Sequence, residues 1–555
     1  MHPHDSCTGA ELIIHLLERE GVELVAGMPG GALLPLYEAL GRSKRIRHIL
    51  ARHEQAAGFI AQGLARATGR VGVCLATSGP GVTNVITALA DAQLDSVPIV
   101  CIAGQVPTHL IGTAAFQEVP TIDMVRPITK ASFFVRDAAE LAQIVPRAFQ
   151  LARSGRPGPV LIDAPKDVQL QRISWPTAAA LERDVAYGAQ AIHYDEAVKY
   201  INAAQRPILY AGGGVATARA HSLLREMAER NDIPVTMTLM GLGALPASHP
   251  LNLGMLGMHG ARYTNRAVDE CDLLIAIGAR FDDRATGARE RFAPGARIIH
   301  IDIDESGFGK VKTPTLAIHD DAGAALAKLI ARLAPRRRPQ WNGRIRFLRN
   351  AYPLRRPQEE RVCSPYGLID AVAAYAPRDA IVATDVGQHQ MWVAQAYPVC
   401  AGRWLTSGGL GAMGFGLPAA IGAALAEPDA TVICFTGDGS LLMNIQELAT
   451  LAELDLNVKI IVMDNGALGL VRQQQELFYG RRFVASSFAQ PSAFPGIARA
   501  FGVPAVDLEA HGSPHRALAD ALAEPGPMLI RAPIAAEHHV LPMVAPGAAN
   551  VEAIA

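Results

Sequence analysis

The sequence lacks any uncharged apolar run of the roughly 20 residues that a membrane-spanning helix needs. It also lacks an excess of either charge, since 51 basic residues stand against 52 acidic ones and the formal net charge is -1. A chain without a positive field is not drawn as a whole to nucleic acid or to an anionic membrane. We therefore expect small-molecule partners, with no nucleic acid and no membrane among them.

Glycine and proline are too few for a disordered or collagen-like chain. The 51 glycines and 37 prolines make up about 16% of the chain, below the roughly 25–30% that is typical of low-complexity sequence. Half of the residues are hydrophobic. A length of 555 residues corresponds to three or four domains of about 150 residues each. The composition indicates a large, compact protein.

Cysteines are also few. There are 7, an odd number, and no two form a C-x-x-C pair. Cys74, Cys101, Cys271 and Cys434 lie in or beside strand-like apolar runs, where a free cysteine acts as a small buried hydrophobe. The N-terminal apolar stretch is interrupted by polar residues such as Glu11, which predicts an amphipathic helix rather than a signal peptide. Both observations favour a reducing, cytoplasmic location.

Three stretches of the chain alternate short β-branched runs with helical periodicity, the pattern of parallel sheets with crossover helices. We therefore predict an α/β fold with three doubly wound parallel-sheet domains, at residues 1–175, 190–335 and 362–555. Composition changes at 171–195. Three consecutive arginines between prolines at 334–344 indicate a solvated linker. A nucleic-acid patch there is the alternative, but no aromatic ladder accompanies the arginines.

Each stretch supplies several predicted strands, and a helix is expected at 78–93 after a Gly/Pro turn. The strands are expected at 71–77, 96–104 and 158–165 in the first stretch, at 206–214, 233–239, 272–280 and 296–304 in the second, and at 379–387, 430–440 and 457–466 in the third.

The most specific pattern lies in the third stretch, where Asp438 ends one predicted strand and Asn465 ends the next. The carboxyl ends of parallel strands form the ligand-binding edge of an α/β sheet. Asp438, the Asn465 side chain and a nearby backbone carbonyl can supply oxygen ligands to Mg²⁺, which keeps room for phosphate oxygens. Gly437 and Gly439 allow the backbone to approach a diphosphate closely. Taken alone, an Asp-Gly pair is also ordinary turn chemistry.

The spacing of these segments matches a cofactor fingerprint. The 24 residues at 440–463 separate Gly437-Asp438-Gly439 from Asp464-Asn465, as in the thiamine-diphosphate (ThDP) pattern GDG-x(24–27)-NN. Asp464 replaces the first Asn of that pattern, at a position that is not the expected metal ligand.

ThDP also needs a carboxylate. Its own aminopyrimidine removes the thiazolium C2 proton, and a carboxylate hydrogen-bonded to the pyrimidine N1′ favours the imino tautomer that acts as the base. Glu54 lies just before the helical run AAGFIAQGLARATG, where ThDP enzymes have this residue. The alternative is a glutamate that merely stabilises a helix N-terminus through the helix dipole.

With both motifs present, the sequence resembles the large catalytic subunit of acetolactate synthase (acetohydroxyacid synthase). The resemblance covers nearly the whole chain, and its specific segments include ILARHEQAAGFIAQGLAR, TSGPGVTN, GQVPTHLIGTAAFQE, DVGQHQMW and TSGGLGAMGFGLPAAIGAA. It implies a fold of the ThDP-dependent enzyme type, with a pyrimidine-binding N-terminal domain, an FAD-binding-like central domain and a C-terminal domain for diphosphate and Mg²⁺.

The resemblance assigns roles on the ThDP side. Glu54 would activate ThDP, Gly411 would accept a hydrogen bond from its 4′-amino group, and Met413 would hold it in a bent V conformation. Core packing is the alternative for Met413. The implied metal ligands are Asp438, Asn465 and the Ala467 carbonyl. The other implied ThDP-binding residues are Gly387, Gln388, His389, Ala412, Gly439, Ser440, Leu468, Gly469 and Leu470.

In the central domain the resemblance is to the FAD site of the family, where the flavin is usually structural and is not reduced during turnover. Gly212-Gly213-Gly214 after a strand is by itself a weak nucleotide signal, because no GxGxxG is present. The implied FAD-binding residues are Arg156, Gly213, Thr238, Leu239, Met240, Leu256, Gly257, Met258, His259, Gly278, Arg280, Asp282, Asp302, Ile303 and Asp321.

The substrate side of the family is matched at Phe116, Gln117, Lys166 and Arg284, to which the resemblance gives catalytic roles. Arg284 could pair bidentately with the carboxylate of the second keto acid. The alternatives are a surface pair between Arg284 and Asp283, and a surface lysine at position 166.

One departure bears on substrate choice. Gln474 aligns with a tryptophan that, in many members, favours 2-ketobutyrate as the acceptor. A flexible amide in place of a flat apolar wall should weaken the preference for one extra methylene, which is worth only about 1–3 kcal/mol at best. We predict little preference for 2-ketobutyrate.

The resemblance implies acetolactate synthase activity in branched-chain amino acid biosynthesis. Pyruvate would be decarboxylated on ThDP, and the hydroxyethyl carbanion would attack a second 2-keto acid, pyruvate or 2-ketobutyrate, to give 2-acetolactate or 2-aceto-2-hydroxybutyrate. The implied cofactors are ThDP, Mg²⁺ and FAD. The implied assembly is a homodimer whose active sites combine Glu54 of one subunit with Asp438 of the other, together with a small regulatory subunit.

Three alternatives stand beside this function. Glyoxylate carboligase lacks the activating glutamate, so Glu54 argues against it. A pyruvate oxidase would use FAD for redox work, and a quinone-coupled form would add a basic amphipathic segment that the C-terminal sequence lacks. A catalytically inactive binding protein would not need Glu54, Asp438 and Asn465 together.

Overall fold

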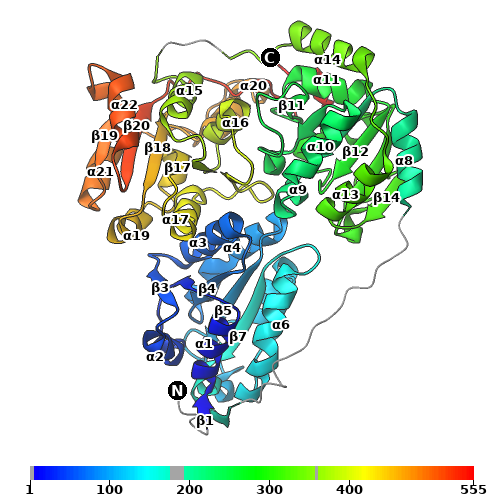
Figure 1. Ribbon diagram of the computed structural model, residues 1–555. Coiled ribbons are helices and arrows are strands. Elements are labelled where there is room, and N and C mark those ends of the chain that lie inside the picture. The colour runs from blue at the N-terminus through cyan, green and yellow to red at the C-terminus, as the bar shows by residue number, and fades with distance from the viewer. Residues whose placement is uncertain (1–5, 176–192, 357–360) are drawn as a thin grey trace.

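The chain folds into three α/β bodies, each built on a six-stranded parallel sheet (Figure 1). The computed structural model describes residues 6–175, 193–356 and 361–555. The arrangement confirms the predicted fold class. Most of the predicted change of domain at 171–195 lies outside the described residues.

The N-terminal body holds its parallel sheet between two layers of helices. Its strands are almost wholly apolar where they are central, as expected of a sheet covered on both faces, and β5 is buried along its whole length. In sheet order the strands are β3 (Arg47–Leu50), β2 (Leu24–Gly27), β4 (Gly72–Ala76), β5 (Ile99–Gln105), β7 (Val160–Pro165) and β6 (Ala131–Phe134). The helices are α1 (Gly9–Arg19), α2 (Leu34–Arg42), α3 (Glu54–Thr68), α4 (Pro80–Asp95), α5 (Thr121–Val125), α6 (Leu141–Arg153) and α7 (Lys166–Leu170).

The predicted amphipathic N-terminal helix is α1. Thr8 and Glu11 form a capping box at its start, which satisfies backbone N–H groups that have no partner within the helix. A short antiparallel pair of β1 (Ser6–Thr8) and β8 (Arg172–Ser174) joins the two ends of this body.

The central body carries the second sheet. In sheet order its strands are β11 (Asn252–Met255), β10 (Val235–Met237), β9 (Pro207–Ala211), β12 (Leu273–Ile277), β13 (Arg297–Asp302) and β14 (Leu316–His319). The helices are α8 (Tyr194–Ala203), α9 (Gly213–Thr217), α10 (His221–Asn231), α11 (Arg262–Glu270), α12 (Asp283–Thr286), α13 (Ala322–Arg332) and α14 (Pro339–Ala351).

The C-terminal body carries the third sheet. In sheet order its strands are β16 (Trp404–Leu405), β15 (Ile381–Thr384), β17 (Val432–Gly437), β18 (Val458–Asp464), β20 (Met528–Pro533) and β19 (Ala505–Asp507). The helices are α15 (Pro365–Tyr375), α16 (Gln388–Ala396), α17 (Gly416–Ala426), α18 (Asp438–Leu441), α19 (Glu447–Leu454), α20 (Gly469–Phe478), α21 (Phe494–Ala500) and α22 (Pro514–Ala523).

The N-terminal and C-terminal sheets share one topology. In both, the second strand in the chain lies at one edge, the first lies next to it, and the third lies on the other side of the first. The chain thus reverses its direction of sheet growth beside the first strand, and a parallel α/β sheet binds its ligand at such a switch point. In the C-terminal sheet this point lies between β15 and β17, and in the central sheet between β9 and β12.

The N-terminal and C-terminal bodies meet through α3 and α17 (Figure 1). A Cβ at Gly63 of α3 would lie 2.1 Å from the backbone oxygen of Ala419, and a Cβ at Gly422 of α17 would lie 2.1 Å from that of Ile60. Only glycine allows the two helix backbones to approach this closely. The two bodies therefore form one continuous core along this contact.

The predicted solvated linker at 334–344 is only partly correct, because Arg337 is exposed but Arg338 and Trp341 are buried. Its last residues begin helix α14, and the Trp341 indole is buried and donates to the Pro207 carbonyl at 3.0 Å. Arg338 is 4% exposed and donates to the carbonyls of Asn231 and Ile201. The guanidinium satisfies carbonyls at the ends of two helices, so this part of the arginine run is structural.

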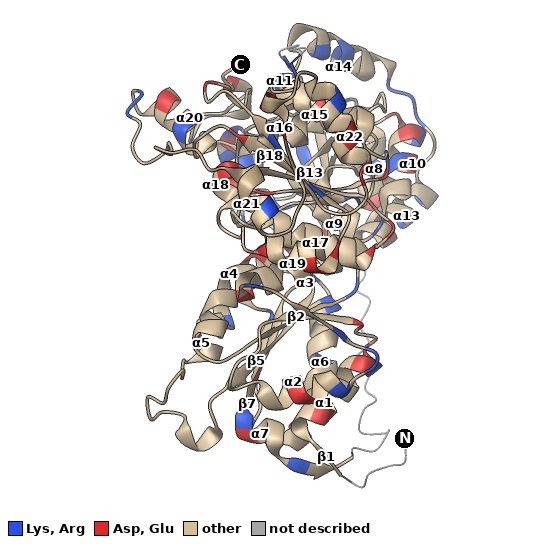
Figure 2. Cartoon of the chain, turned by 90° about the vertical axis from the view of Figure 1, so that its left-hand side faces the viewer, with Lys and Arg blue, Asp and Glu red and all other residues tan. Residues whose placement is uncertain are grey.

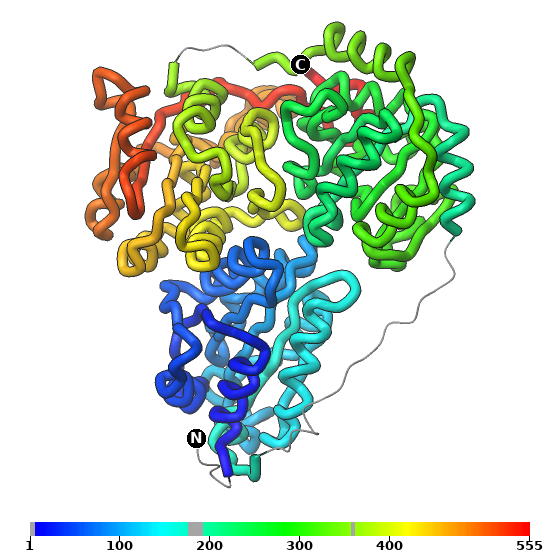
Figure 3. Tube along the Cα trace, in the orientation of Figure 1, coloured from blue at the N-terminus to red at the C-terminus, as the bar shows by residue number. Residues whose placement is uncertain are grey.

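The C-terminal segment returns to the central body, as the red trace in Figure 3 shows. Val544 N donates to the Met258 carbonyl at 3.0 Å, and Ala288 N donates to the Ala548 carbonyl at 2.9 Å. Figure 2 shows Lys, Arg, Asp and Glu interspersed over all three bodies. Among the described residues, no helix is long and apolar enough to cross a membrane. Cys74, Cys101, Cys271 and Cys434 are buried.

Candidate active site

Asp438 and Asn465 come together at the carboxyl edge of the C-terminal sheet. Asp438 begins α18 directly after β17, and Asn465 follows β18. The Ala467 backbone N–H donates to Asp438 Oδ2 and to Asn465 Oδ1, at 3.1 Å in both cases. One carboxylate oxygen and one amide oxygen therefore accept from the same N–H group and lie close together. This donor set fits Mg²⁺, which prefers oxygen ligands and fills its remaining positions with water and phosphate oxygens.

The surroundings of Asp438 disfavour its charged form when no cation is bound. Burial, together with the nearby Asp464 carboxylate, raises the pKa of Asp438 to about 7, against hydrogen bonds from backbone N–H groups that lower it. Asp464 itself pairs with Arg531, whose Nε lies 2.7 Å from Asp464 Oδ2. The residue that departs from the ThDP pattern thus has its own counter-ion. Asp464 is therefore paired with Arg531 and not with the cation.

Gln388 and His389 begin α16 at the switch point of the same sheet. Gln388 Oε1 accepts from Asn465 Nδ2 at 3.1 Å, which ties the predicted diphosphate side to the predicted metal site. His389 is buried, and burial lowers its pKa to about 3, so its ring is neutral. Its Nε2 has no hydrogen-bond partner among the described residues. An unpartnered buried ring nitrogen beside Gly387 is the kind of group that a bound phosphate would satisfy.

The segment with Gly411, Ala412 and Met413 lies between β16 and α17, and side chains from two bodies hold it. Ala412 N donates to Ser407 Oγ at 2.8 Å, and Ser407 Oγ in turn donates to Asp91 of α4 in the N-terminal body. Met413 is half-buried, so part of its side chain remains free to touch a ligand.

The remaining residues predicted on the ThDP side surround Asp438. Ser440 Oγ donates to the Val386 carbonyl at 2.7 Å, and Leu468 N donates to the Ser486 carbonyl at 2.9 Å. A Cβ at Gly469 would lie 2.0 Å from Gln388 Oε1, so a side chain there would displace Gln388. Gly439 lies against Leu468, and Leu470 follows in the first turn of α20.

Glu54 is the first residue of α3 and is 8% exposed. Asn84 Nδ2 of α4 donates to Glu54 Oε2 at 2.9 Å. The His53 side chain, rather than Glu54, accepts from the backbone at this helix end, through a bond from Gln55 N. Capping therefore does not occupy the Glu54 carboxylate, which leaves its other oxygen for a ligand.

The predicted substrate residues of the N-terminal body lie on a loop and at a strand end. Phe116 is 88% exposed, and Gln117 has a φ of 63°. Lys166 begins α7 directly after β7 and is half-buried. The Asp167 carboxylate accepts from Thr108 N at 3.0 Å, which fixes one end of the loop.

Arg284 lies on the central body with two thirds of its side chain exposed. Its Nε is 3.8 Å from Asp283 Oδ2, and its Nη1 is 3.6 Å from Met258 Sδ. An ion pair this long and this exposed contributes little stability, so Asp283 does not prevent Arg284 from meeting another carboxylate.

The predicted FAD residues gather at the carboxyl edge of the central sheet and beside it. Gly213 begins α9 after β9, Gly278 follows β12, and Asp302 ends β13. Arg156 reaches across from the N-terminal body, with Nη1 3.2 Å from Asp304 Oδ2. The others at this edge or in neighbouring turns are Thr238, Leu239, Met240, Leu256, Gly257, Met258, His259, Arg280, Asp282, Ile303 and Asp321.

Two of these residues show how the site connects to its surroundings. Thr238 Oγ1 accepts from Gly241 N at 3.0 Å and fixes the turn after β10. His259 is buried, and its Nδ1 lies 3.1 Å from the Pro542 carbonyl; burial lowers its pKa to about 4. A carboxyl-edge cluster at the switch point, with glycines after β9 and β12, suits a dinucleotide-like ligand.

The chain by itself does not bring all predicted residues together. The Glu54 region is linked to the C-terminal body by a bond from Asn444 Nδ2 to Gln55 Oε1 at 3.2 Å and by one from Arg52 N to Glu447 Oε1 at 2.8 Å. Among the described residues, no hydrogen bond or ion pair joins Glu54 to Asp438.

Three family profiles match the chain. They are "Thiamine pyrophosphate enzyme, N-terminal TPP binding domain" at residues 7–124, "Thiamine pyrophosphate enzyme, central domain" at 194–329 and "Thiamine pyrophosphate enzyme, C-terminal TPP binding domain" at 385–532. The large subunit of acetolactate synthase isozyme 1 from Escherichia coli K12 is 54% identical over 551 residues, which cover 99% of this chain and 97% of the relative.

The chain belongs to the acetolactate synthase large-subunit family.

Further relatives agree. The acetolactate synthase large subunit of Parasynechococcus marenigrum is 47% identical, with 99% of this chain and 91% of the relative covered. The large subunit of isozyme 2 from Escherichia coli K12 is 45% identical, with 98% of each chain covered. Acetolactate synthase family membership confirms the resemblance drawn from the motifs.

Two residues of this family member were missed in the sequence. The Asp385 carboxylate accepts from Gly414 N at 2.8 Å and from Gly416 N at 3.1 Å, and so anchors the segment after Met413. Gln473 Oε1 accepts from Gln388 Nε2 at 2.9 Å. Asp385 lies near the end of the strand predicted at 379–387, two residues before Gly387, and this position was a usable signal. Gln473 had none, because its partner is 85 residues away.

Proposed function

We propose that this chain is the catalytic subunit of an acetolactate synthase, which decarboxylates pyruvate and joins the two-carbon product to a second 2-keto acid. The observation that carries the proposal is the pair of carboxylate sites, Glu54 with Asn84 and Asp438 with Asn465, in a chain 54% identical to a curated synthase subunit. The products are 2-acetolactate and, from 2-ketobutyrate, 2-aceto-2-hydroxybutyrate.

The residues divide the work on the cofactors. Asp438, Asn465 and the Ala467 carbonyl hold Mg²⁺, and Gln388 and His389 bind the diphosphate. Asn84 orients the Glu54 carboxylate, whose free oxygen holds a proton at the pyrimidine N1′. Bound ThDP supplies an electron sink for the decarboxylation. The central cluster around Gly213, Gly278 and Asp302 holds FAD without using it for redox chemistry.

On the substrate side, Arg284 binds the carboxylate of the second keto acid. Phe116 and Gln117 cover the site and exclude water, and Lys166 adds a positive charge at the end of β7. Because Gln474 has a flexible amide in place of a flat apolar ring, it gives little preference between pyruvate and 2-ketobutyrate.

We also propose that the active unit is a homodimer with each site at the subunit interface. Two features support it: no hydrogen bond or ion pair joins Glu54 to Asp438 among the described residues, and Phe116 is 88% exposed although its role requires a covered site. A small regulatory subunit is a further partner, since the relatives are named large subunits.

The test is an assay of the purified chain with pyruvate, ThDP, Mg²⁺ and FAD. Acetolactate should form, and its formation should stop when Mg²⁺ is chelated. A chain that binds the cofactors and forms no acetolactate, with or without a small subunit, would contradict the proposal.

A pyruvate oxidase is the competing function. Under anaerobic conditions a synthase should keep producing acetolactate while the flavin absorbance stays constant, because no electrons reach FAD. Loss of the flavin absorbance with pyruvate would support the oxidase instead.

A further inference from the structure

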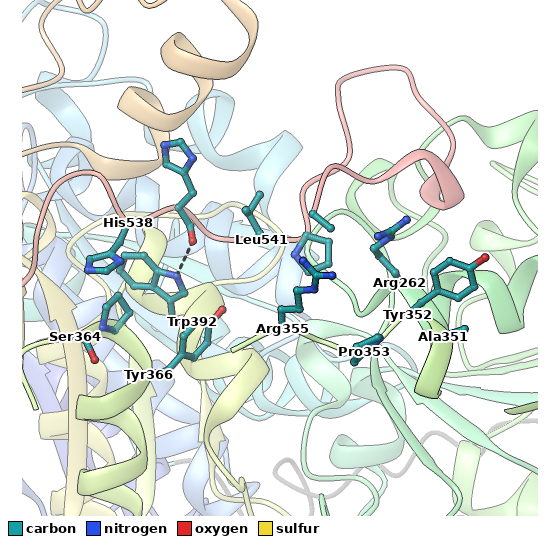
Figure 4. A pocket seen from close by; sticks show the side chains of 14 residues that line it. Arg262, Ala351, Tyr352, Pro353, Arg355, Ser364, Tyr366, Trp392, His538 and Leu541 are labelled. Carbon is teal, nitrogen blue, oxygen red and sulfur yellow. Dashed lines mark hydrogen bonds between the residues drawn. The ribbon is translucent and has the colours of Figure 1, made fainter. Parts of the chain in front are cut away.

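A cavity lies at the seam between the central and C-terminal bodies. Its volume is about 270 Å³, and none of the residues predicted for the active site lines it. One wall comes from α11 and the segment after α14, and the other from α15, α16 and the C-terminal segment (Figure 4).

Two guanidinium groups line this cavity and have no anionic partner among the described residues. Arg262 stacks on Tyr352, with its Cζ 5.3 Å from the ring centroid, and its Nε is buried without an acceptor. Arg355 is exposed, and neither arginine has a hydrogen bond or ion pair with a described residue. No Asp or Glu side chain is among the described lining residues, and the α-carboxylate of Ala555, which also lines the cavity, forms no ion pair with either arginine. Because a desolvated N–H without an acceptor costs free energy, an anion here would be stabilised.

Most of the remaining lining is apolar or aromatic, and Ser364, His538 and His539 are its other polar residues. Leu541 and Pro542 contribute aliphatic surface, and Trp392 contributes its ring (Figure 4). Two of the aromatic residues already use their polar atoms: Trp392 Nε1 donates to the His539 carbonyl at 3.4 Å, and Tyr366 OH donates to Gln395 Oε1 at 2.7 Å. The cavity therefore suits a ligand with one anionic end and an apolar body.

The size of the cavity narrows the ligand class. Pockets for drug-sized ligands hold roughly 300–1,000 Å³, so about 270 Å³ suits a smaller molecule and is too small for a nucleotide. The fork of a guanidinium group matches a carboxylate, which carries one charge and is less costly to desolvate than a phosphate dianion.

The C-terminal wall of the cavity is bonded to the predicted active site. The His538 carbonyl accepts from Gln388 Nε2 at 2.8 Å, and Val540 N donates to Gln473 Oε1 at 2.8 Å. A ligand that packs on Pro542 thus touches the segment that holds Gln388.

We propose that this cavity binds a small monocarboxylate with an apolar body. The carboxylate lies on Arg262, with Arg355 as the second cation, and the body lies against Trp392 and Pro542.

The test is calorimetric titration of the full chain, loaded with ThDP, Mg²⁺ and FAD, with hexanoate as the probe. Hexanol has the same chain without the charge, and inorganic phosphate has the charge without the chain. Hexanoate should bind at millimolar concentration, and both comparison ligands should bind at least about tenfold more weakly. Absence of hexanoate binding, or phosphate binding of equal strength, would overturn the proposal.

Variants locate the binding. Arg262→Gln should weaken hexanoate binding about tenfold or more. The matched control is Arg266→Gln, because Arg266 also stacks on Tyr352, at 4.1 Å, but does not line the cavity; it should change binding less than about twofold. Ala351→Phe fills the cavity and keeps both arginines, so it should also abolish binding, and it decides the matter if Arg262→Gln does not fold. If hexanoate bound at the active site instead, its affinity would be the same in all three variants as in the unmodified chain. That result would refute the assignment.

Discussion

Asp464 and Arg531 form an ion pair directly behind the predicted metal site, with 2.7 Å between Oδ2 and Nε. Asp464 is 5% exposed at its side chain and Arg531 is 18% exposed, and Arg531 also pairs with Asp507 and Glu509. The extra carboxylate next to Asn465 is thus neutralised from the neighbouring strand. Arg531 is thus the counter-ion of Asp464, the residue that departs from the ThDP pattern.

The pair makes a prediction about stability. Arg531→Gln leaves a buried carboxylate without a counter-ion, and we expect a loss of about 2–4 kcal/mol of unfolding free energy, measured by urea unfolding. The double variant Asp464→Asn/Arg531→Gln restores the asparagine of the pattern and should recover more than half of that loss. Asp507 loses its partner in both variants, so its contribution cancels. A double variant as unstable as the single one would show that Asp464 is not the reason.

Glu54 gives a prediction about activity. Glu54→Gln keeps the size and the contact with Asn84 but cannot hold the carboxylate's charge at the pyrimidine, so acetolactate formation should fall about 100-fold or more. Asn84→Ala should cause a smaller loss, because it only frees the carboxylate to move. Thermal unfolding of both variants is the control. If Glu54 merely stabilised the start of α3, the unfolding temperature would fall while the rate per folded enzyme stayed normal.

Asp163 gives a prediction about pH. It is 1% exposed, its Oδ1 has no hydrogen-bond partner among the described residues, and burial raises its pKa to about 7 against hydrogen bonds from Gln105 and Thr121. The unfolded chain releases this proton near pH 4, so the folded state binds the extra proton between about pH 4 and about pH 7. Stability must therefore fall as pH rises through this window.

The measurement is the difference in unfolding free energy between the unmodified chain and Asp163→Asn. The variant should gain roughly 2 kcal/mol relative to the unmodified chain between about pH 5 and about pH 8. Other buried acids are common to both proteins and drop out of the difference. If the unfolding free energies of the two proteins changed in parallel with pH, the pKa of Asp163 would be the same in the folded and the unfolded chain, which would contradict the prediction.

Gln474 gives a prediction about specificity. It is half-buried on α20, next to the buried Gln473. With pyruvate and 2-ketobutyrate in competition, the unmodified chain should form both products without strong bias. Gln474→Trp should raise the share of 2-aceto-2-hydroxybutyrate about tenfold, and Gln474→Asn should leave it unchanged. A strong initial bias toward that product would contradict the prediction.

The sequence allowed the sheets and the metal edge to be predicted, because both depend on local patterns. Asp438 and Asn465 each end an apolar strand, and the edge where parallel strands end is shared. Residues whose roles depend on distant partners could not be found in this way. Arg531 lies 67 residues from Asp464, and neither position is unusual alone.

The arginine run at 334–344 shows a second limit. Adjacent arginines usually face solvent, yet Arg338 is buried because its guanidinium meets the carbonyls of Asn231 and Ile201. The sequence shows that a side chain is charged, but it does not show which backbone carbonyls the folded chain brings next to it. The catalytic roles given to Phe116, Lys166 and Arg284 remain predictions.

The contact of Gly63 and Gly422 with the opposing backbones limits how this sequence can change. Helix α3 begins at Glu54, and α17 follows the segment with Met413. Any larger residue at either glycine would separate these helices and shift both ends at once. In proteins that evolve from this chain, loops and surface residues can therefore change, whereas Gly63 and Gly422 should stay glycine.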